Sequence, residues 1–520
     1  MNYLFFLNHY PPFRYPPQIA TVFEQAQIIA NDSNHNVTLI YCDTCETIGK
    51  CYHFRRSSKL VCHLCNSYKK YFLKKLSNKI NLLPLSKLSK EKKKEIIPSF
   101  NYDSVEEIKK LSYKNVDIGY AAFSTYISSI ARNLNPLMDD FFKKKFDQFL
   151  ERCCMFTNIV DFALNEFCPD HVYLFNSRFI DTKPIVDICI SRKIPFTSLE
   201  TKTTLEEQHL QVFFENTIAH DIHHITSLIK KQWDSSSLPV EKKIQIASAF
   251  YNNRRNAIPA GDKVYVKRQQ LGLLPDGWNA HKHNIAIFNS SEDEFAAIGK
   301  VYESELLFPT QLDGIKAILE LFRDHTEMHF YLRVHPNLTY VNYLYHNLMY
   351  ELEKRYTNLT VIKADSPIST YSLIDAADKI MVFGSTTGAE SAFWGKPTIL
   401  LGNAGYRNLN ICYLPKDSED VKNLILNFNL PAKDKIGAFQ YAYYLLNEED
   451  GKYNFFRFIN KKIYIFKKPF WLRYFDIKGA PLSKFITTIS RLVCLKIYDY
   501  LPKEEIPTKE DEEVYEQYLQ

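Results

Sequence analysis

Short apolar runs alternate with segments of helical length along most of this chain, and this alternation restricts the folds that it can adopt. In the first half the runs are rich in β-branched and aromatic residues and cover 3–7, 37–41, 171–175 and 194–199. A helical pattern from about 138 to 167 precedes the third run, and another follows it. Strand, helix and strand at this spacing are typical of βαβ units in a parallel sheet.

A second series of the same kind begins at Asn284. Its apolar runs cover 285–288, 329–334, 361–363, 380–383 and 398–401. Helical patterns over 310–323 and 340–356 fit between these runs. The chain has 520 residues, which exceeds the size at which a single hydrophobic core stops growing. The sequence therefore predicts an α/β protein with two Rossmann-like lobes.

The stretch between the two series is polar, contains Pro259 and Pro275, and has no sustained apolar period. It is typical of a link between lobes. These patterns predict an N-terminal lobe over 1–240 with a cysteine cluster and a lysine-rich insertion, a linker over 241–283, a second lobe over 284–437, and a helical, aromatic and basic extension over 438–520.

The extension contains the aromatic and basic segment 454–475, NFFRFINKKIYIFKKPFWLRYF. Two interpretations stay open. The segment could form a buried helix that returns to the first lobe. Alternatively, its interleaved aromatic and basic side chains could make a peripheral contact with lipid headgroups. An acidic tail follows from Lys503.

Charge and hydropathy exclude several classes of protein. The net charge of +6 comes from 65 basic and 59 acidic residues, a balance that does not favour nucleic acid as a partner. No apolar run approaches the roughly 18 residues that span a bilayer, and the first residues do not resemble a signal peptide. We expect a cytoplasmic protein, with the inner face of the membrane open as an alternative. The sequence leaves the oligomeric state open.

Polar motifs follow three strands of the second series, where ligands bind in parallel sheets. After the run 285–288, Ser290 and Ser291 can cap a helix and leave backbone N–H groups for an anion, although a simple capping box is an alternative. After the next run, Arg333 and His335 can bind phosphate oxygens, and Pro336 makes the loop rigid.

The third motif is the turn GSTTGAE, which leads from a strand into a helix. The hydroxyls of Ser385, Thr386 and Thr387, with the N–H groups at the helix start, can hold a diphosphate. Glu390 lies one turn later and can accept both hydrogen bonds of a ribose diol. The alternative is an ordinary strand–helix turn with a capping glutamate. Because all three motifs lie in one lobe, we predict that this lobe binds a nucleotide-activated donor.

The phrases FNSSEDEFAAIG, LRVHPNL, DSPISTYSLI and FGSTTGAESAFWGKPTIL resemble those of bacterial capsular and surface polysaccharide biosynthesis proteins with a GT-B-type fold. LFNSRF, IPFTSLE and NTIAHDI upstream are similar to the same proteins. The resemblance covers about residues 1–430 and implies two lobes facing a central cleft. It also implies a glycosyltransferase, inverting and metal-independent, that moves a sugar from a nucleotide-sugar to a growing polysaccharide or glycolipid. In such proteins His335, Ser385, Thr386 and Glu390 would bind the donor nucleotide.

This chain departs from the resemblance on the acceptor side. Ser177 stands where glycine is expected, and Thr201 and Lys202 follow Glu200 in place of Arg-Gly. Inverting transfer needs a base on the acceptor hydroxyl, which we expect from the first lobe. The candidates for the base are Glu200, Asp221, His220 and His9. Arg178 and Arg14 are candidates for binding an anionic acceptor.

No catalytic metal is predicted, because the sequence has no Asp-x-Asp motif and Arg333, His335 and the 386–387 turn can neutralise a leaving phosphate. A structural metal is a separate hypothesis. Two Cys-x-x-Cys pairs lie close together, and the favoured zinc ligands are Cys45, Cys51, Cys62 and Cys65. Burial of the cysteines and an iron–sulfur cluster are the alternatives.

Two further functions remain open. The same His-Pro motif and Ser/Thr turn would serve a polyol-phosphate transferase with a CDP-linked donor. A non-catalytic partner in polysaccharide assembly or export would keep the fold without the activity. Nucleotide binding separates this partner from the two enzymes, and the identity of the donor separates the enzymes from each other.

Overall fold

The computed structural model describes most of residues 1–469. The gaps are 8–15, 33, 44–65, 67–68, 70–72, 75, 93–94, 129–132, 205–207, 259, 262–263, 340, 342–343, 460–461 and 466–467. The chain divides into two compact units. Among the described residues, unit 1 contains Met1–Lys202, the segment up to Ala219 and the segment that begins at Glu448, and unit 2 contains the continuous segment His220–Asn447 with 203–204.

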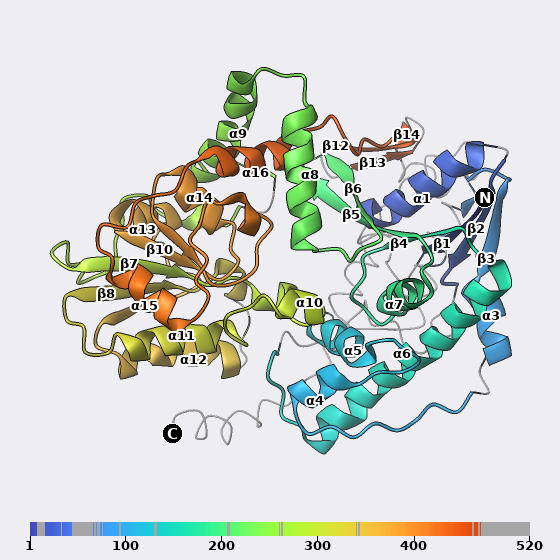
Figure 1. Ribbon diagram of the computed structural model, residues 1–520, viewed down its shortest axis with the longest axis horizontal. Coiled ribbons are helices and arrows are strands. Elements are labelled where there is room, and N and C mark those ends of the chain that lie inside the picture. The colour runs from blue at the N-terminus through green and yellow to red at the C-terminus, as the bar shows by residue number, and fades with distance from the viewer. Residues whose placement is uncertain are drawn as a thin grey trace, which may run out of the picture. The chain divides into compact units, whose positions relative to one another are not determined.

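Unit 1 is built on a six-stranded sheet. In spatial order its strands are β3 (Ile80–Pro84), β2 (Asn36–Tyr41), β1 (Asn2–Leu7), β4 (His171–Phe175), β5 (Phe196–Thr203) and β6 (His209–Glu215). Neighbours from β3 through β5 are parallel. The predicted strands over 3–7, 37–41 and 171–175 are confirmed, and the predicted strand over 194–199 is β5. The chain winds from β1 outward to β3 and then places β4 beside β1, so the direction of winding changes between β1 and β4 (Figure 1).

The helices of unit 1 are α1 (Pro16–Asn31), α3 (Leu85–Lys92), α4 (Val105–Lys110), α5 (Ile118–Tyr126), α6 (Asp140–Phe167) and α7 (Lys183–Arg192). The predicted helix over 138–167 is α6. It begins where the Asp139 carboxylate caps the N–H of Phe142 at 2.7 Å and ends at Cys168 in the left-handed conformation. Part of the lysine-rich insertion forms β3, which pairs with β2 at the edge of the sheet, and α3.

Unit 2 is built on a five-stranded sheet in which all neighbours are parallel. In spatial order its strands are β11 (Thr398–Leu400), β10 (Lys379–Val382), β7 (His283–Phe288), β8 (Met328–Arg333) and β9 (Leu359–Ile362). The second predicted strand series is therefore confirmed. The winding changes direction between β7 and β10, and Figure 1 shows helices above and below this sheet.

The α-helices of unit 2 are α8 (Ile222–Ser235), α9 (Val240–Arg255), α10 (Lys300–Glu303), α11 (Gln311–Leu321), α12 (Leu344–Arg355), α13 (Thr370–Ala376), α14 (Thr387–Phe393), α15 (Ser418–Leu426) and α16 (Ile436–Leu446). Its 3-10 turns are η2 (Val266–Arg268), η3 (Glu292–Glu294), η4 (Pro336–Leu338) and η5 (Arg407–Leu409).

The segment 241–283, predicted as the link between lobes, lies within unit 2, and its first part forms α9. The buried residues Ala247, Phe250, Tyr251 and Arg254 recur at helical spacing, so one stripe of this polar helix faces the core of unit 2. Tyr251 Oη donates a hydrogen bond of 2.7 Å to the carbonyl oxygen of Ala438, which lies in α16. The stripe was hard to recognise because polar residues surround it and an arginine occupies one of its positions.

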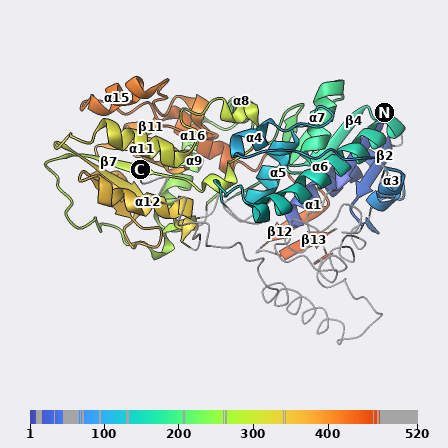
Figure 2. The ribbon, with the colours of Figure 1, turned by 90° about the horizontal axis from the view of Figure 1, so that it is seen from below.

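The interpretation of 454–475 as a helix does not hold for its described part, which ends at 469. The chain there forms the antiparallel strands β12 (Phe456–Ile459), β13 (Lys462–Ile465) and β14 (Lys468–Pro469). The alternation of aromatic or β-branched residues with charged ones suits a strand better than a helix. The return of this segment to the first lobe is confirmed, because β12 contacts α1 (Figure 2) and Phe456 is buried in the core of unit 1.

A buried carboxylate fixes the returning segment. The side chain of Glu24 in α1 is completely buried and accepts hydrogen bonds from the backbone N–H groups of Asn454 and Phe455. Tyr453 Oη donates to the carbonyl oxygen of Pro17 at 3.3 Å. Within the part of the chain that the structure describes, no helix is long and apolar enough to cross a bilayer. Peripheral membrane contact stays a prediction.

Candidate functional site

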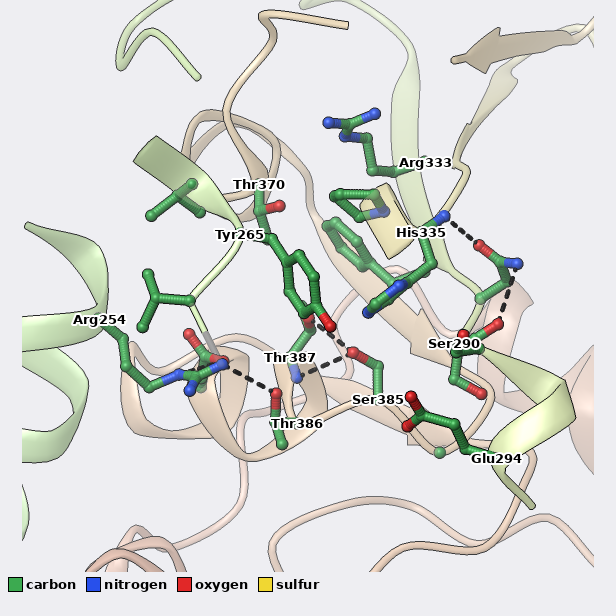
Figure 3. Close-up of a pocket in the computed structure, with 18 of the residues that line it drawn as sticks. Arg254, Tyr265, Ser290, Glu294, Arg333, His335, Thr370, Ser385, Thr386 and Thr387 are labelled. Carbon is green, nitrogen blue, oxygen red and sulfur yellow. Dashed lines mark hydrogen bonds and ion pairs between the residues drawn. The ribbon is translucent and has the colours of Figure 1, made fainter. Parts of the chain in front are cut away.

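A pocket lies in unit 2 at the carboxyl ends of β7, β8 and β10, where the winding of the sheet changes direction (Figure 3). Open α/β sheets bind their ligands at such a switch point. All eight residues predicted to bind the donor line this pocket, and they are Ser290, Ser291, Arg333, His335, Ser385, Thr386, Thr387 and Glu390. Three motifs that span about a hundred residues of sequence, from Ser290 to Glu390, are therefore gathered into one cavity.

The turn after β10 is held rigidly by its own groups. Gly384 has a φ of +91°, and a Cβ added there would lie 2.5 Å from the carbonyl oxygen of Asn403, so this position requires glycine. Ser385 Oγ donates to Thr387 Oγ1 at 2.9 Å and accepts from the N–H of Thr387 at 3.2 Å. Tyr406 Oη donates to the carbonyl oxygen of Ser385. The pocket thus presents hydroxyl groups on a fixed backbone.

Glu390 lies beneath this turn and is bonded through both carboxylate oxygens. Oε1 accepts from Arg254 Nε at 3.1 Å, and Oε2 accepts from Tyr371 Oη. Burial and the carboxylate raise the pKa of Tyr371, which keeps its phenol protonated as a donor. A ribose contact, as predicted for Glu390, would have to share oxygens that Arg254 and Tyr371 already use. The observed role of this carboxylate is to hold the side chain of Arg254 in place.

His335 follows β8 and is oriented by two backbone interactions. Its own N–H donates to Asn289 Oδ1 at 2.7 Å, which joins the ends of β7 and β8. Its Nδ1 accepts from the N–H of Asn337 at 3.2 Å, so the neutral ring carries its proton on Nε2. Tyr265 packs edge-on against the imidazole, with ring centroids 5.1 Å apart. The ring is thereby presented in one orientation with Nε2–H as its donor.

Arg333 lines the pocket but directs its guanidinium at a neighbouring loop. It donates to the carbonyl oxygens of Lys363 and Ser366, the latter at 3.2 Å, and only 1% of the residue is exposed. Burial lowers the pKa of Arg333 to about 10, which leaves it charged at neutral pH. Through these contacts Arg333 stabilises the chain after β9, whereas the sequence predicts that Arg333 binds phosphate.

The two predicted serines also build the wall of the pocket. Ser290 Oγ donates to the carbonyl oxygen of Phe383 at 2.9 Å and accepts from Gln311 Nε2 at 2.6 Å. Ser291 Oγ donates to Asp293 Oδ1 at 2.9 Å and accepts from Asn337 Nδ2 at 2.8 Å. Both side chains are buried, and their hydroxyls are used within the protein. They join the ends of β7, β8 and β10.

Sequence reasoning missed several residues that line the pocket, and these are Arg254, Tyr265, Thr370, Tyr371 and Glu294. The first comes from α9, in the region that was predicted to be a linker. The helical spacing from Ala247 to Arg254 was a usable signal, because an arginine in an apolar stripe must find a buried partner. The phrase DSPISTYSLI contains Thr370 and Tyr371 at the start of α13 but gave no role for them, and the loop that holds Tyr265 gave no comparable pattern.

Unit 1 has polar residues at its own switch point, between β1 and β4. Asn176 directly follows β4 with a φ of +64°, and its Nδ2 donates to Glu200 Oε1 at 2.8 Å. Its Oδ1 accepts from the N–H groups of Ser177 and Arg178 at 2.7 and 3.0 Å, which fixes the orientation of the amide. Burial raises the pKa of Glu200 to about 7, against the lowering effects of Asn176 and Arg178.

The other residues predicted for the acceptor side are not brought together into one site as the donor residues are. Arg178 is buried and donates to Ser128 Oγ. Asp221 caps α8 by accepting from the N–H of His224 at 3.0 Å, and His220 precedes it with a φ of +75°. This cap gives Asp221 a structural role, and both residues belong to unit 2. The predicted residues outside the described part of the chain are His9, Arg14, Cys45, Cys51, Cys62 and Cys65.

The fold and the pocket together define an α/β protein with two Rossmann-like units, one of which has a ligand pocket at its switch point. No family model and no curated protein sequence matches the chain. One similar structure is the β-Kdo 2,4 transferase KpsC of Thermosulfurimonas dismutans, at 12% identity over 53% of this chain and 79% of that chain, with a TM-score of 0.33.

Two other similar structures are UDP-GlcNAc 2-epimerases. The enzyme from Neisseria meningitidis, bound to UDP-GlcNAc, is 12% identical over 87% of this chain and 96% of its own, with a TM-score of 0.26. The enzyme from Methanocaldococcus jannaschii, in complex with UDP-GlcNAc and UDP, is 12% identical over 86% and 99%, with a TM-score of 0.27. A transferase is thus among the similar structures, but these TM-scores are too low to transfer a ligand or a reaction to this chain.

Proposed function

We propose that this protein is a glycosyltransferase that takes a sugar from a nucleotide-sugar bound in the pocket of unit 2 and transfers it to a saccharide or glycolipid acceptor of a surface polysaccharide. One observation supports this most strongly. The three sequence motifs that predicted a donor site meet in a single pocket at the switch point of a parallel sheet. Hydroxyls, a fixed imidazole and a buried guanidinium there suit the phosphates of a nucleotide.

The chemistry of the leaving group fits these residues. Breaking the bond between the sugar and phosphate leaves negative charge on the nucleotide, which fixed donors stabilise best in a partly buried site. The hydroxyl of Thr386, the Nε2–H of His335 and the charge of Arg254 surround the space in which that charge would develop. Ser385 and Thr387 keep the turn in place.

We assign the acceptor base to Glu200 of unit 1. With a pKa of about 7, this carboxyl is substantially ionised at neutral pH and is basic enough to accept a proton from an acceptor hydroxyl. Asn176 holds it in one orientation. Asp221 is the weaker candidate, since its carboxylate caps α8. Direct attack by the activated hydroxyl would invert the configuration of the transferred sugar.

A thermal-shift screen tests the proposal. The purified protein is heated with UDP, GDP, CDP, CMP and their common sugar conjugates, because a ligand that binds only the folded state raises the melting temperature. A shift with one nucleotide family supports a transferase and identifies its donor class. If the melting temperature rises with cytidine nucleotides, a second assay must determine whether a sugar or a polyol phosphate is transferred. If folded protein responds to no nucleotide, the proposed transferase activity is wrong and a non-catalytic role in assembly or export replaces it.

A further inference from the structure

Two guanidinium groups border the pocket, and their surroundings differ. Arg333 is directed at backbone carbonyl oxygens of the loop after β9. Arg254 reaches the pocket from α9 and contacts the turn that carries the hydroxyls. Its Nη2 donates to Thr386 Oγ1 at 3.3 Å, while its Nε donates to Glu390 at 3.1 Å. Arg254 is therefore a buried cation coupled directly to a group in the pocket.

Buried partners hold the Arg254 side chain in place. The side chains of Arg254 and Glu390 are 8% and 4% exposed, and the ion pair is supported by the hydrogen bond from Tyr371 to the second carboxylate oxygen. A charge pair that is removed from water is stable only when the remaining polar atoms of both side chains also form hydrogen bonds. Phe250 packs under the guanidinium, with its ring centroid 5.1 Å from Cζ. These contacts leave the guanidinium few alternative positions.

The contact with Thr386 determines what this hydroxyl can do. An oxygen that accepts a hydrogen bond from an arginine has its own O–H hydrogen left to donate elsewhere. Thr386 is half-buried and lines the pocket, so that donor is available to a bound group that only accepts hydrogen bonds. Phosphate oxygens are acceptors of this kind and are negatively charged.

The hydrogen-bond donors around the pocket favour an anion at the end that holds Thr386. Figure 3 shows Arg254 and Thr386 on one side of the pocket and the carboxylate of Glu294 on the other. Because Glu390 compensates the charge of Arg254, a phosphate would be held at the turn by the hydrogen-bond donors of Arg254 and Thr386. The charge of Glu294 would repel it from the other side. The carboxylate side would suit a neutral part of the same ligand that carries hydroxyl groups.

We propose that Arg254 and Thr386 form the phosphate-binding element of this pocket, with Glu390 as the positioning residue that holds Arg254. This inference refines the proposed function and rests on it for the identity of the complete ligand. It moves the phosphate contact from Arg333 to Arg254 and makes α9 part of the binding site. No covalent step is assigned to these residues, which bind and orient a phosphate group.

Pyrophosphate is the probe that tests this element directly. Its binding to the full-length protein is measured by titration calorimetry at low ionic strength. The variants are Arg254→Gln, Arg254→Lys and the double variant Arg254→Gln/Glu390→Gln, which removes both buried charges and protects against misfolding. We expect the variants that lack the arginine charge to bind pyrophosphate at least about tenfold more weakly. Arg254→Lys should lie in between, because it keeps the charge and loses the forked geometry.

Arg255 provides a matched control in the same helix. It pairs with the exposed Asp375 at 3.0 Å and does not line the pocket. Arg255→Gln should leave the affinity for pyrophosphate unchanged. A double-mutant cycle with Thr386→Val should show that the losses at Arg254 and Thr386 are not additive, because one residue positions the other.

The outcomes separate this inference from the proposed function. Wild-type protein that does not bind pyrophosphate, or folded Arg254 variants that bind it as tightly as wild type, would overturn the inference. Uridine and cytidine serve as phosphate-free probes, and a loss of the same size for the matching nucleoside would show that Arg254 does not act on phosphate. If pyrophosphate binding depends on Arg254 but no nucleotide binds, the phosphate element stands and the nucleotide-sugar function falls.

Discussion

The two units wind their sheets in the same way but place different chemistry at the point where the winding changes. In unit 2 the residues there include hydroxyls, an imidazole, the ion pair of Arg254 with Glu390, and the carboxylate of Glu294. In unit 1 the described residues there include Asn176, which is bonded to the carboxyl of Glu200. A shared backbone topology therefore determines where a site forms, and the side chains at the strand ends determine what it can do.

Glu390, which is buried, and Glu200, which is half-buried, show this difference most clearly. Glu390 faces the cation of Arg254 at 3.1 Å, whereas Glu200 faces the neutral amide of Asn176 at 2.8 Å. An amide stabilises a carboxylate less than a guanidinium does, and burial raises the pKa of Glu200 to about 7. One glutamate is therefore suited to hold a cation, and the other is suited to exchange a proton near neutral pH.

Removing the carboxylate of unit 1 should have the largest effect on turnover. Glu200→Gln should lower kcat by about 10²–10⁴-fold, because a general base contributes this much, while nucleotide affinity stays the same. Steady-state kinetics and calorimetry with the nucleotide found by the thermal-shift screen measure the two quantities. Glu215→Gln, at the exposed end of β6, is the control. A Glu200→Gln variant with normal kcat would show that Glu200 is not the base, and the proposed difference in catalytic role between the two glutamates would then be wrong.

Breaking the ion pair of unit 2 should chiefly reduce stability. Arg254→Met leaves the carboxylate of Glu390 buried without its cation, which should lower the free energy of unfolding by about 3–5 kcal/mol. Arg254→Met/Glu390→Leu should recover most of this loss, because an apolar pair of similar volume replaces the charges. Urea denaturation of both variants measures the difference. Equal stability of the single and double variants would show that the pair is not coupled.

Changing the neighbour of Glu200 should move the pH profile. As pH rises through about 7, Glu200 loses its proton and becomes able to act as a base, so kcat/KM should rise over this range. Asn176→Asp keeps the acceptor for the N–H groups of Ser177 and Arg178 but places a second carboxylate beside Glu200. Like charges raise a carboxyl pKa, so the acidic limb should move upward by about one unit, against the opposing charge of Arg178.

The pH dependence of kcat/KM, measured for wild type and Asn176→Asp, provides the comparison. Ser385→Ala in unit 2 is a useful control, because it should weaken donor binding without moving the acidic limb. An acidic limb that stays in place in Asn176→Asp would assign it to another group and leave Glu200 without a catalytic role.

The smallest effect on the pocket should come from removing metal. If Cys45, Cys51, Cys62 and Cys65 bind zinc, elemental analysis should find about one zinc per chain. A strong chelator should then lower the melting temperature while nucleotide affinity stays unchanged, because the residues that line the pocket come from 254–390. Stable protein without metal would leave these cysteines with a structural or redox role.

The sequence allowed prediction of the sheets and of the pocket's location, because strand runs and strand-end motifs are local patterns. Parallel strands end at one edge, so residues 290, 335 and 386 could be expected to meet. Individual roles depended on partners distant in sequence. Nothing near Arg333 indicates that the carbonyl oxygens of 363 and 366 accept its hydrogen bonds. Similarly, only packing shows that the polar helix α9 delivers Arg254.

The contact between Glu24 and the returning segment has a consequence for the order in which the two units fold during synthesis. During synthesis on a ribosome, the segment 220–447 emerges complete and can close its own core while the following residues are still being added. Unit 1 must wait, because Glu24 has no backbone N–H donors from 454 and 455 until that segment arrives. The half of the protein that is made first should therefore be the half that folds last, and a released chain that ends at residue 447 would have a complete pocket but an incomplete N-terminal unit.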